Sequence, residues 1–238
     1  MTVPPAAPVT LRRSAGDRYS ILLLGGFLVL ITALMLVSAI AILSTMPGTG
    51  VFILVVTAAL MALLVPMWTE TQVRWRTRIE IGDRDVHFGL PARRGYIRQA
   101  PFDAVVPLTD IVGLEMRVEA FRALGNTVLQ RAFSMRLRNG TRIVLGGDRR
   151  VVSNFFEKAA GVLAERTATT VRDLGTVDGN PGFLMMWGQT VPSWDAAPMS
   201  PEKADLRARQ ESAAWRLVGI VFGAMMLVRL LVWIFSRQ

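Results

Sequence analysis

Three long apolar runs constrain this chain more than any other feature of its sequence. The first covers residues 19–43, the second residues 51–68, and the third residues 217–235, where Arg229 is the only charge. A helix needs roughly 20 apolar residues to cross about 30 Å of bilayer hydrocarbon. Each run is therefore predicted to be a transmembrane helix, and the first two are predicted to form a hairpin because only a short loop separates them.

The composition supports a membrane protein and excludes most classes of catalytic and cofactor chemistry. Apolar residues make up 52% of the 238-residue chain and charged residues 19%. There is no cysteine and a single histidine, His87, which excludes disulfides, thiolate chemistry and Cys/His zinc sites. We expect His87 to be structural or exposed. With no nucleophile–base pair, metal-ligand set or intramembrane carboxylate, we predict a non-enzyme without cofactor or metal, and an enzyme or transporter is poorly supported.

A cleaved signal peptide is the competing interpretation of the first run, because residues 39–41 read Ala-Ile-Ala and imitate a cleavage site. The apolar stretch before that site is, however, about twice as long as an ordinary signal-peptide core. A second apolar run also follows almost immediately. The first run is therefore predicted to remain as a span.

Positive charge predicts the orientation of the hairpin. Arg12, Arg13 and Arg18 precede the first run, whereas residues 44–50 between the first two runs carry no charge. Three further arginines follow the second run: Arg74, Arg76 and Arg78. Short cytoplasmic segments carry excess arginine and lysine, so the N-terminus and residues 69–216 are predicted to be cytoplasmic and the C-terminus periplasmic. The 25 arginines against 2 lysines suggest a GC-rich bacterial genome, hence a bacterial inner membrane.

The predicted cytoplasmic part alternates apolar and polar residues with a period of two, which is typical of strands. Residues 79–88 form a predicted hairpin around Gly82-Asp83-Arg84, and residues 104–108 a short strand that Pro107 confines to a sheet edge. Residues 112–120 form another predicted strand, with Glu115 and Glu119 on a face that we expect to be solvated.

A further hairpin is predicted over residues 131–146, around Asn139-Gly140. A two-residue loop would place Leu137 and Ile143 on opposite faces, so we predict a three-residue loop with a bulge near Gly140. This loop would pair Leu137 with Ile143 and Met135 with Leu145. An amphipathic helix follows, capped by Asp148 or Ser153.

This succession of elements resembles a known family. The segments Thr77 to Gly89 and Val106 to Glu115, followed by the Asn139-Gly140 hairpin and a helix, are similar to bacterial pleckstrin-homology-like (PH-like) domains attached to an N-terminal pair of membrane helices. The resemblance covers roughly residues 20–166. It implies a binding or scaffolding module, with an antiparallel sheet or barrel capped by one helix. The Gly82-Asp83-Arg84 loop is too short and too acidic to copy the phosphoinositide pocket of eukaryotic relatives.

The expected fold class is thus a membrane α plus α+β protein with three transmembrane helices and a cytoplasmic PH-like domain. The expected layout is a cytoplasmic tail (1–18), a transmembrane hairpin (19–68), a PH-like domain (69–167), a linker with an apolar docking segment (168–199), and a juxtamembrane and third transmembrane helix (200–238). In the linker, Trp187 and Trp194 either pack over the domain or dock a partner. In the third span, Gly219 and Gly223 permit close helix contact.

Two questions stay open from the sequence. Arg229 either reaches the outer headgroups or pairs with a group of another membrane protein. A set of cytoplasmic arginines is either solvated positive-inside charge or an anionic lipid surface: Arg74, Arg76, Arg78, Arg93, Arg94 and Arg98. No sequence pattern supports nucleic-acid binding. We expect a non-catalytic scaffold, assembly factor or accessory subunit that contacts membrane lipid and another integral membrane protein. The alternative is lipid or lipid-linked ligand binding by the basic domain.

Overall fold

The computed structural model describes residues 8–92, 94, 99–123, 126–149, 153–180, 190 and 192–213. The chain divides into two compact units, the first made mainly of residues up to Asp110 and the second mainly of residues from Ile111 onward. Each unit contains a four-stranded sheet. The predicted third span, residues 217–235, lies outside the described residues.

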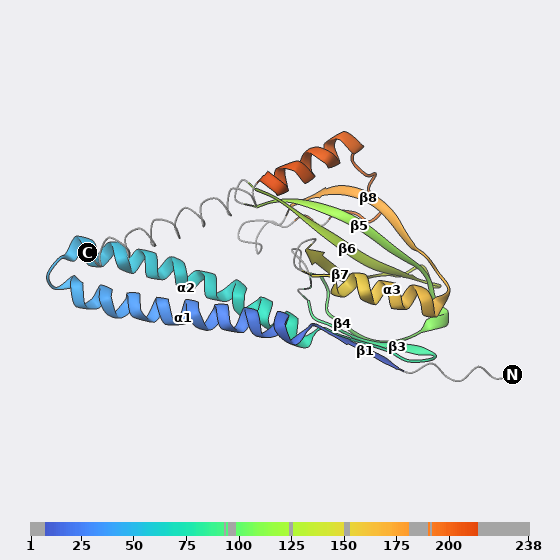
Figure 1. The fold of residues 1–238 in the computed structure, drawn as a ribbon, viewed down its shortest axis with the longest axis horizontal. Coiled ribbons are helices and arrows are strands. Elements are labelled where there is room, and N and C mark those ends of the chain that lie inside the picture. Colours follow the sequence, from blue (N-terminus) through green and yellow to red (C-terminus); the bar gives the residue numbers. More distant parts are fainter. Residues whose placement is uncertain are drawn as a thin grey trace, which may run out of the picture. The chain divides into compact units, whose positions relative to one another are not determined.

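The first unit contains two long helices, α1 (Ala15–Leu43) and α2 (Pro47–Arg76), which pack side by side (Figure 1). Ser14 caps α1 by accepting a hydrogen bond from the Asp17 amide at 3.1 Å, and Pro47 lies in the first turn of α2. Only 11% and 12% of their most apolar windows are buried. Both helices are therefore long and apolar enough to cross a membrane, as predicted, and neither resembles the buried core helix of a soluble domain.

The same unit contains an antiparallel sheet in the order β1-β2-β3-β4, formed by β1 (Val9–Arg12), β2 (Arg78–Ile81), β3 (Asp85–Leu90) and β4 (Phe102–Pro107). The predicted hairpin is confirmed, because Ile79 lies opposite Phe88 and Ile81 opposite Val86. All four side chains are fully buried. Pro107 ends the edge strand β4, also as predicted.

Strand β1 lies in the segment predicted to be a cytoplasmic tail. It precedes α1 in the chain, yet it pairs with β2, which follows α2, and Leu11 lies opposite Ile79. The two free ends of the helical hairpin are therefore hydrogen-bonded to each other through one sheet.

The second unit contains a mixed sheet in the order β7-β6-β5-β8, formed by β5 (Ile111–Ala123), β6 (Asn126–Leu137), β7 (Arg142–Arg149) and β8 (Val171–Gly179). The 3₁₀ turn η1 (Leu108–Asp110) precedes it. Strand β8 lies in the predicted linker and runs parallel to β5, so the sheet is not wholly antiparallel. The parallel pairing follows from the crossover through α3, since parallel strands need a long connection.

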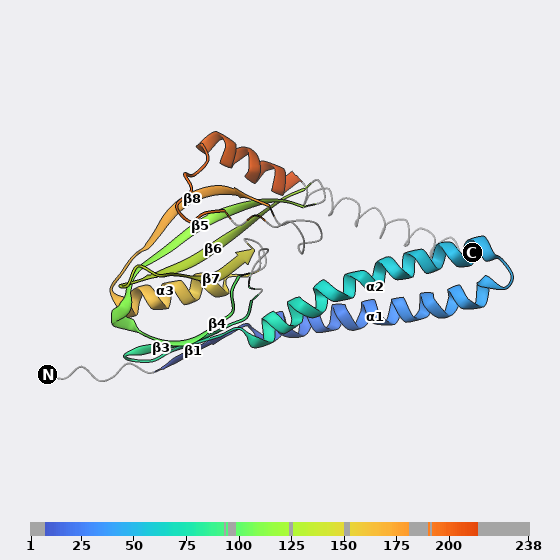
Figure 2. The same ribbon diagram turned by 180° about the vertical axis from the view of Figure 1, so that it is seen from behind.

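Helix α3 (Phe155–Thr167) lies on one face of this sheet, and a helix over residues 201–213 lies on the other side (Figures 1 and 2). The helix is amphipathic, as predicted, and its buried face includes Phe156, Ala159 and Leu163. The N-cap position is Asn154, which makes no side-chain capping bond, and the predicted residue Asp148 caps the helix from outside that position. The Asp148 carboxylate accepts from the Glu157 amide at 2.9 Å and from the Ser153 hydroxyl at 2.8 Å. Closure of the two sheets into a barrel stays a prediction.

The β6–β7 hairpin confirms the predicted loop length but corrects its pairing. The Leu137 amide donates to the Thr141 carbonyl at 2.8 Å, which leaves a three-residue loop with Gly140 at a φ of +83°. Met135 therefore pairs with Ile143, not with Leu145. The predicted shared apolar face is kept because the shift is an even number of residues. The irregularity in the ladder lies instead between Phe133 and Ser134.

Candidate functional site

A charged cluster joins the sheet-side ends of α1 and α2. Asp17, in the first turn of α1, binds the Arg74 guanidinium from the last turn of α2 through its carboxylate and through its carbonyl, the latter at 2.9 Å. Arg74 also donates to Glu70 at 3.2 Å, and Arg13 approaches Asp17 at 3.5 Å. This cluster and the β1–β2 ladder both hold the same two helix ends together.

Aromatic side chains extend the cluster to the helix surface. Tyr19 and Trp75 meet edge to face with 5.9 Å between ring centroids, and the Arg18 guanidinium lies 5.0 Å from the Trp75 ring. Arginine and ring-bearing residues with one polar end are favoured at the interface between lipid and water. We call this group the helix-end collar: Arg13, Asp17, Arg18, Tyr19, Arg74 and Trp75.

The structure places the predicted basic residues in different environments. Arg76 is exposed and Arg78 is partly exposed beside Glu80, at 3.5 Å. Arg94 is only 3% exposed and donates to the carbonyls of Pro91 and Ala100 at 2.8 and 2.7 Å. Burial lowers the pKa of Arg94 to about 10. Arg94 therefore anchors its own loop and does not present its charge to a surface ligand.

Arg93 and Arg98 lie outside the described residues, as do Trp187, Gly219, Gly223 and Arg229.

His87 belongs to a small polar group on the first sheet. Its Nε2 lies 3.1 Å from the Asp103 carboxylate, and its Nδ1 lies 3.3 Å from the Arg78 guanidinium. The imidazole is partly exposed. Among the residues that the structure describes, no group of three or more His, Cys, Asp or Glu side chains is placed to hold a metal ion.

The charged face of β5 overturns one expectation from the sequence. Glu115, Arg117 and Glu119 alternate as predicted, but their side chains are only 6%, 1% and 5% exposed where a solvated face was expected. The physical reason is that a distant segment covers this face, and the alternation along the strand does not indicate that segment. Residues 192–195 lie over this face and contribute backbone carbonyls and the Trp194 ring.

Arg117 is the centre of this buried network. Its Nε and Nη2 donate to one oxygen of Glu119 at 3.0 and 2.6 Å. Its Nη1 donates to the Ser193 carbonyl at 2.7 Å and its Nη2 to the Pro192 carbonyl at 3.0 Å. The Trp194 ring centroid lies 4.0 Å from the guanidinium carbon, within cation–π range. Trp194 therefore contacts the chain's own sheet.

A second pair of contacts holds the same segment. Arg142 on β7 donates to Glu115 at 2.9 Å and to Asp195 at 3.0 Å. The hydrogen bond that Arg142 donates to Asp195 raises the pKa of Arg142, and the same bond lowers the pKa of Asp195. Burial raises the pKa of Glu119, although Arg117 and Gln130 oppose that shift. Together these contacts hold residues 192–195 on the sheet.

Residues 201–213 are held to the second unit by a separate set of contacts. Asp178, on β8, accepts from Lys203 at 2.6 Å and from Arg207 at 3.1 Å. Burial raises the pKa of Asp178, but the two cations outweigh it and the pKa lies below its ordinary value. Glu211 accepts from the Leu129 amide at 2.9 Å. The helix that leads toward the predicted third span is thus docked on the sheet.

No protein-family model, curated protein or solved structure matches this chain.

Proposed function

We propose that this chain is a non-catalytic membrane-anchored module, in which the α1–α2 hairpin spans the bacterial inner membrane and holds PH-like β-structure at the cytoplasmic surface. There the module acts by contact with another integral membrane protein, as a scaffold, assembly factor or accessory subunit. Support for the PH-like comparison comes from the order of elements, since β2, β3 and β4, then β5, β6 and β7, are followed by one helix.

The observation that carries the proposal is the pairing of β1 with β2 across the helical hairpin. Because β1 leads into α1 and β2 leaves α2, the sheet begins where the two helices end. A sheet joined in this way cannot move away from the ends of its anchor. An anchor of this kind serves to position a domain at a fixed depth.

The chemistry of the helices supports a lipid environment. Their most apolar windows are almost wholly unburied, and large side chains such as Leu23 and Phe52 are 72% and 68% exposed. Exposed apolar surface of this extent is unfavourable in water at about 25 cal/mol per Å². The helix-end collar, with its arginines, marks the cytoplasmic end by the positive-inside rule.

The edge strand β4 is the place where we expect a partner to make contact. Within the described residues β4 pairs with β3 alone, and Val105 on β4 is 60% exposed. An edge strand offers unpaired backbone donors and acceptors to an extended segment of a partner. The alternative, lipid binding by the basic domain, is less favoured because Arg94 is buried.

A photo-crosslinking amino acid at Val105, in the full-length chain in native membranes, tests this function. We expect a discrete adduct with one integral membrane protein. The same amino acid at Thr45, which is exposed in the loop between α1 and α2, serves as the control and is expected to give no such adduct. A membrane-embedded chain that migrates as an uncrosslinked 26.2 kDa species from both positions would count against a partner at β4.

A further inference from the structure

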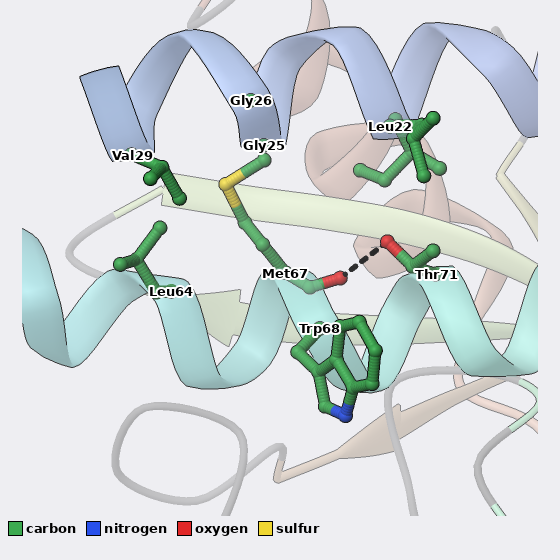
Figure 3. Close-up of a pocket in the computed structure, with 9 residues that line it drawn as sticks. Leu22, Gly25, Gly26, Val29, Leu64, Met67, Trp68 and Thr71 are labelled. Atoms are coloured by element: carbon green, nitrogen blue, oxygen red, sulfur yellow. Dashed lines mark hydrogen bonds between the residues drawn. The ribbon is translucent and has the colours of Figure 1, made fainter. Parts of the chain in front are cut away.

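An apolar groove of about 310 Å³ runs between α1 and α2 (Figure 3). Leu22, Gly25 and Val29 line it from α1, and Leu64, Trp68 and Thr71 line it from α2. Figure 3 shows the Met67 side chain reaching across from α2 to Gly25 on α1. The Thr71 hydroxyl donates to the Met67 carbonyl at 2.9 Å, so this polar group of the lining is already satisfied.

A cation and an aromatic ring lie one helical turn beyond one end of the groove. Arg18 precedes Leu22 by one helical turn on α1, and Trp75 follows Thr71 by one turn on α2. The two side chains meet at that end, with the Arg18 guanidinium 5.0 Å from the Trp75 ring. The Arg18 Nε is buried and has no hydrogen-bond partner in the described part of the chain.

The length of the groove decides between a lipid and a helix as occupant. From Ile21 to Val29 the lining rises roughly 12 Å along α1, less than half of the approximately 30 Å hydrocarbon thickness. A partner helix packs along the whole membrane depth, whereas one acyl chain extends from the headgroup level to the middle of the bilayer. The volume lies at the lower end of the range for small-molecule sites.

We propose that this groove binds one acyl chain of an anionic glycerophospholipid, with the lipid phosphate bound by Arg18. The proposal rests on the membrane-spanning hairpin of the proposed function. Charge complementarity favours an anionic headgroup, because three arginines, Arg13, Arg18 and Arg74, face two carboxylates at these helix ends, and both Asp17 and Glu70 are bound by Arg74.

The test uses the full-length chain, purified in detergent, with phosphatidylglycerol or phosphatidylcholine added and bound lipid counted by native mass spectrometry. We expect one retained phosphatidylglycerol and little phosphatidylcholine. Arg18→Gln should weaken phosphatidylglycerol binding about fivefold, the effect of one arginine at a membrane surface. Gly25→Leu should weaken it at least as much by filling the groove. A Cβ at Gly25 would lie 3.8 Å from the Met67 Cε, which is an ordinary van der Waals contact.

Matched controls separate the site from general lipid contact. Arg76→Gln removes an exposed arginine near the same helix end, and Gly48→Leu adds the same side chain at the opposite end of the hairpin, where a Cβ meets nothing within 4 Å. Both should bind like the unmodified chain. Equal retention by all variants, or equal retention of both lipids, would overturn the proposal. A photo-crosslinker at Leu22 that labels protein and not lipid would do the same.

Carbonate extraction of the same membranes distinguishes the two proposals. If the chain resists extraction while the variants retain lipid equally, only the lipid site is refuted. If carbonate releases the chain, the membrane anchor is refuted, and the lipid site with it.

Discussion

Replacing Arg117 by alanine is expected to destabilise the second unit by about 3–5 kcal/mol, because the substitution leaves Glu119 buried without its cation. Glu119 is 5% exposed and accepts two hydrogen bonds from Arg117, at 3.0 and 2.6 Å. The change also removes two donors to the carbonyls of Pro192 and Ser193. Urea unfolding of the full chain in detergent, followed by circular dichroism, measures the loss.

Arg136→Ala is the matched control for this prediction. Arg136 lies 3.5 Å from Glu115, but its side chain is 51% exposed, so we expect a loss below about 1 kcal/mol. A double variant, Arg117→Met with Glu119→Leu, should recover much of the stability, since an apolar pair can replace a buried ion pair. If Arg117→Ala costs no more than Arg136→Ala, the buried network does not hold this unit together.

Replacing Phe88 by alanine is expected to cost about 3–5 kcal/mol in the first unit, through lost burial and the cavity that remains. Phe88 is fully buried on β3, lies opposite Ile79, and its ring centroid is 5.9 Å from that of Phe102. This sheet also joins the ends of α1 and α2. The variant should therefore raise the rate of proteolysis of β1 in membrane vesicles as well as lowering the unfolding midpoint.

Val105→Ala on the neighbouring strand β4 serves as the comparison. Val105 is 60% exposed, so its truncation should change the free energy of unfolding by about 0.5 kcal/mol or less. Similar losses of unfolding free energy for Phe88→Ala and Val105→Ala would show that Phe88 does not belong to a packed core of the first sheet.

Local patterns predicted the elements whose burial is decided nearby in the chain. The uncharged runs predicted α1 and α2, although α2 continues to Arg76, beyond the predicted end at residue 68. The alternation of Ile79, Ile81, Val86 and Phe88 predicted a hairpin because both strands meet across a tight turn. Pro107 predicted an edge strand because it cannot donate to a ladder.

The elements that the sequence did not predict depend on distant partners. Strand β1 is only four residues long, and its partner β2 lies beyond both long helices. Strand β8 contains Asp173, Gly175 and Asp178, which are residues typical of turns, yet it pairs in parallel with β5 across the α3 crossover. Neither pairing leaves a local signal in the residues themselves.

The burial of the charged face of β5 likewise depends on a distant part of the chain. The alternation of Glu115, Arg117 and Glu119 predicts that they share one face of the strand, but the burial of that face depends on residues 192–195, far along the chain. Opposite charges spaced two apart on one strand, with a tryptophan in a later loop, are compatible with either a solvated or a covered face. Only the tertiary contact with Trp194 decides between them.

The orientation of the hairpin is the claim on which the proposed function depends, and cysteine labelling tests it most directly. The chain has no native cysteine, so Thr45→Cys, between α1 and α2, and Asn139→Cys, at the tip of the β6–β7 hairpin, each give one exposed thiol. With a membrane-impermeant maleimide, Thr45→Cys should react in intact cells from the periplasmic side, and Asn139→Cys only after lysis. Labelling of Asn139→Cys in intact cells, or protection of Thr45→Cys, would contradict a cytoplasmic sheet module on a two-helix anchor.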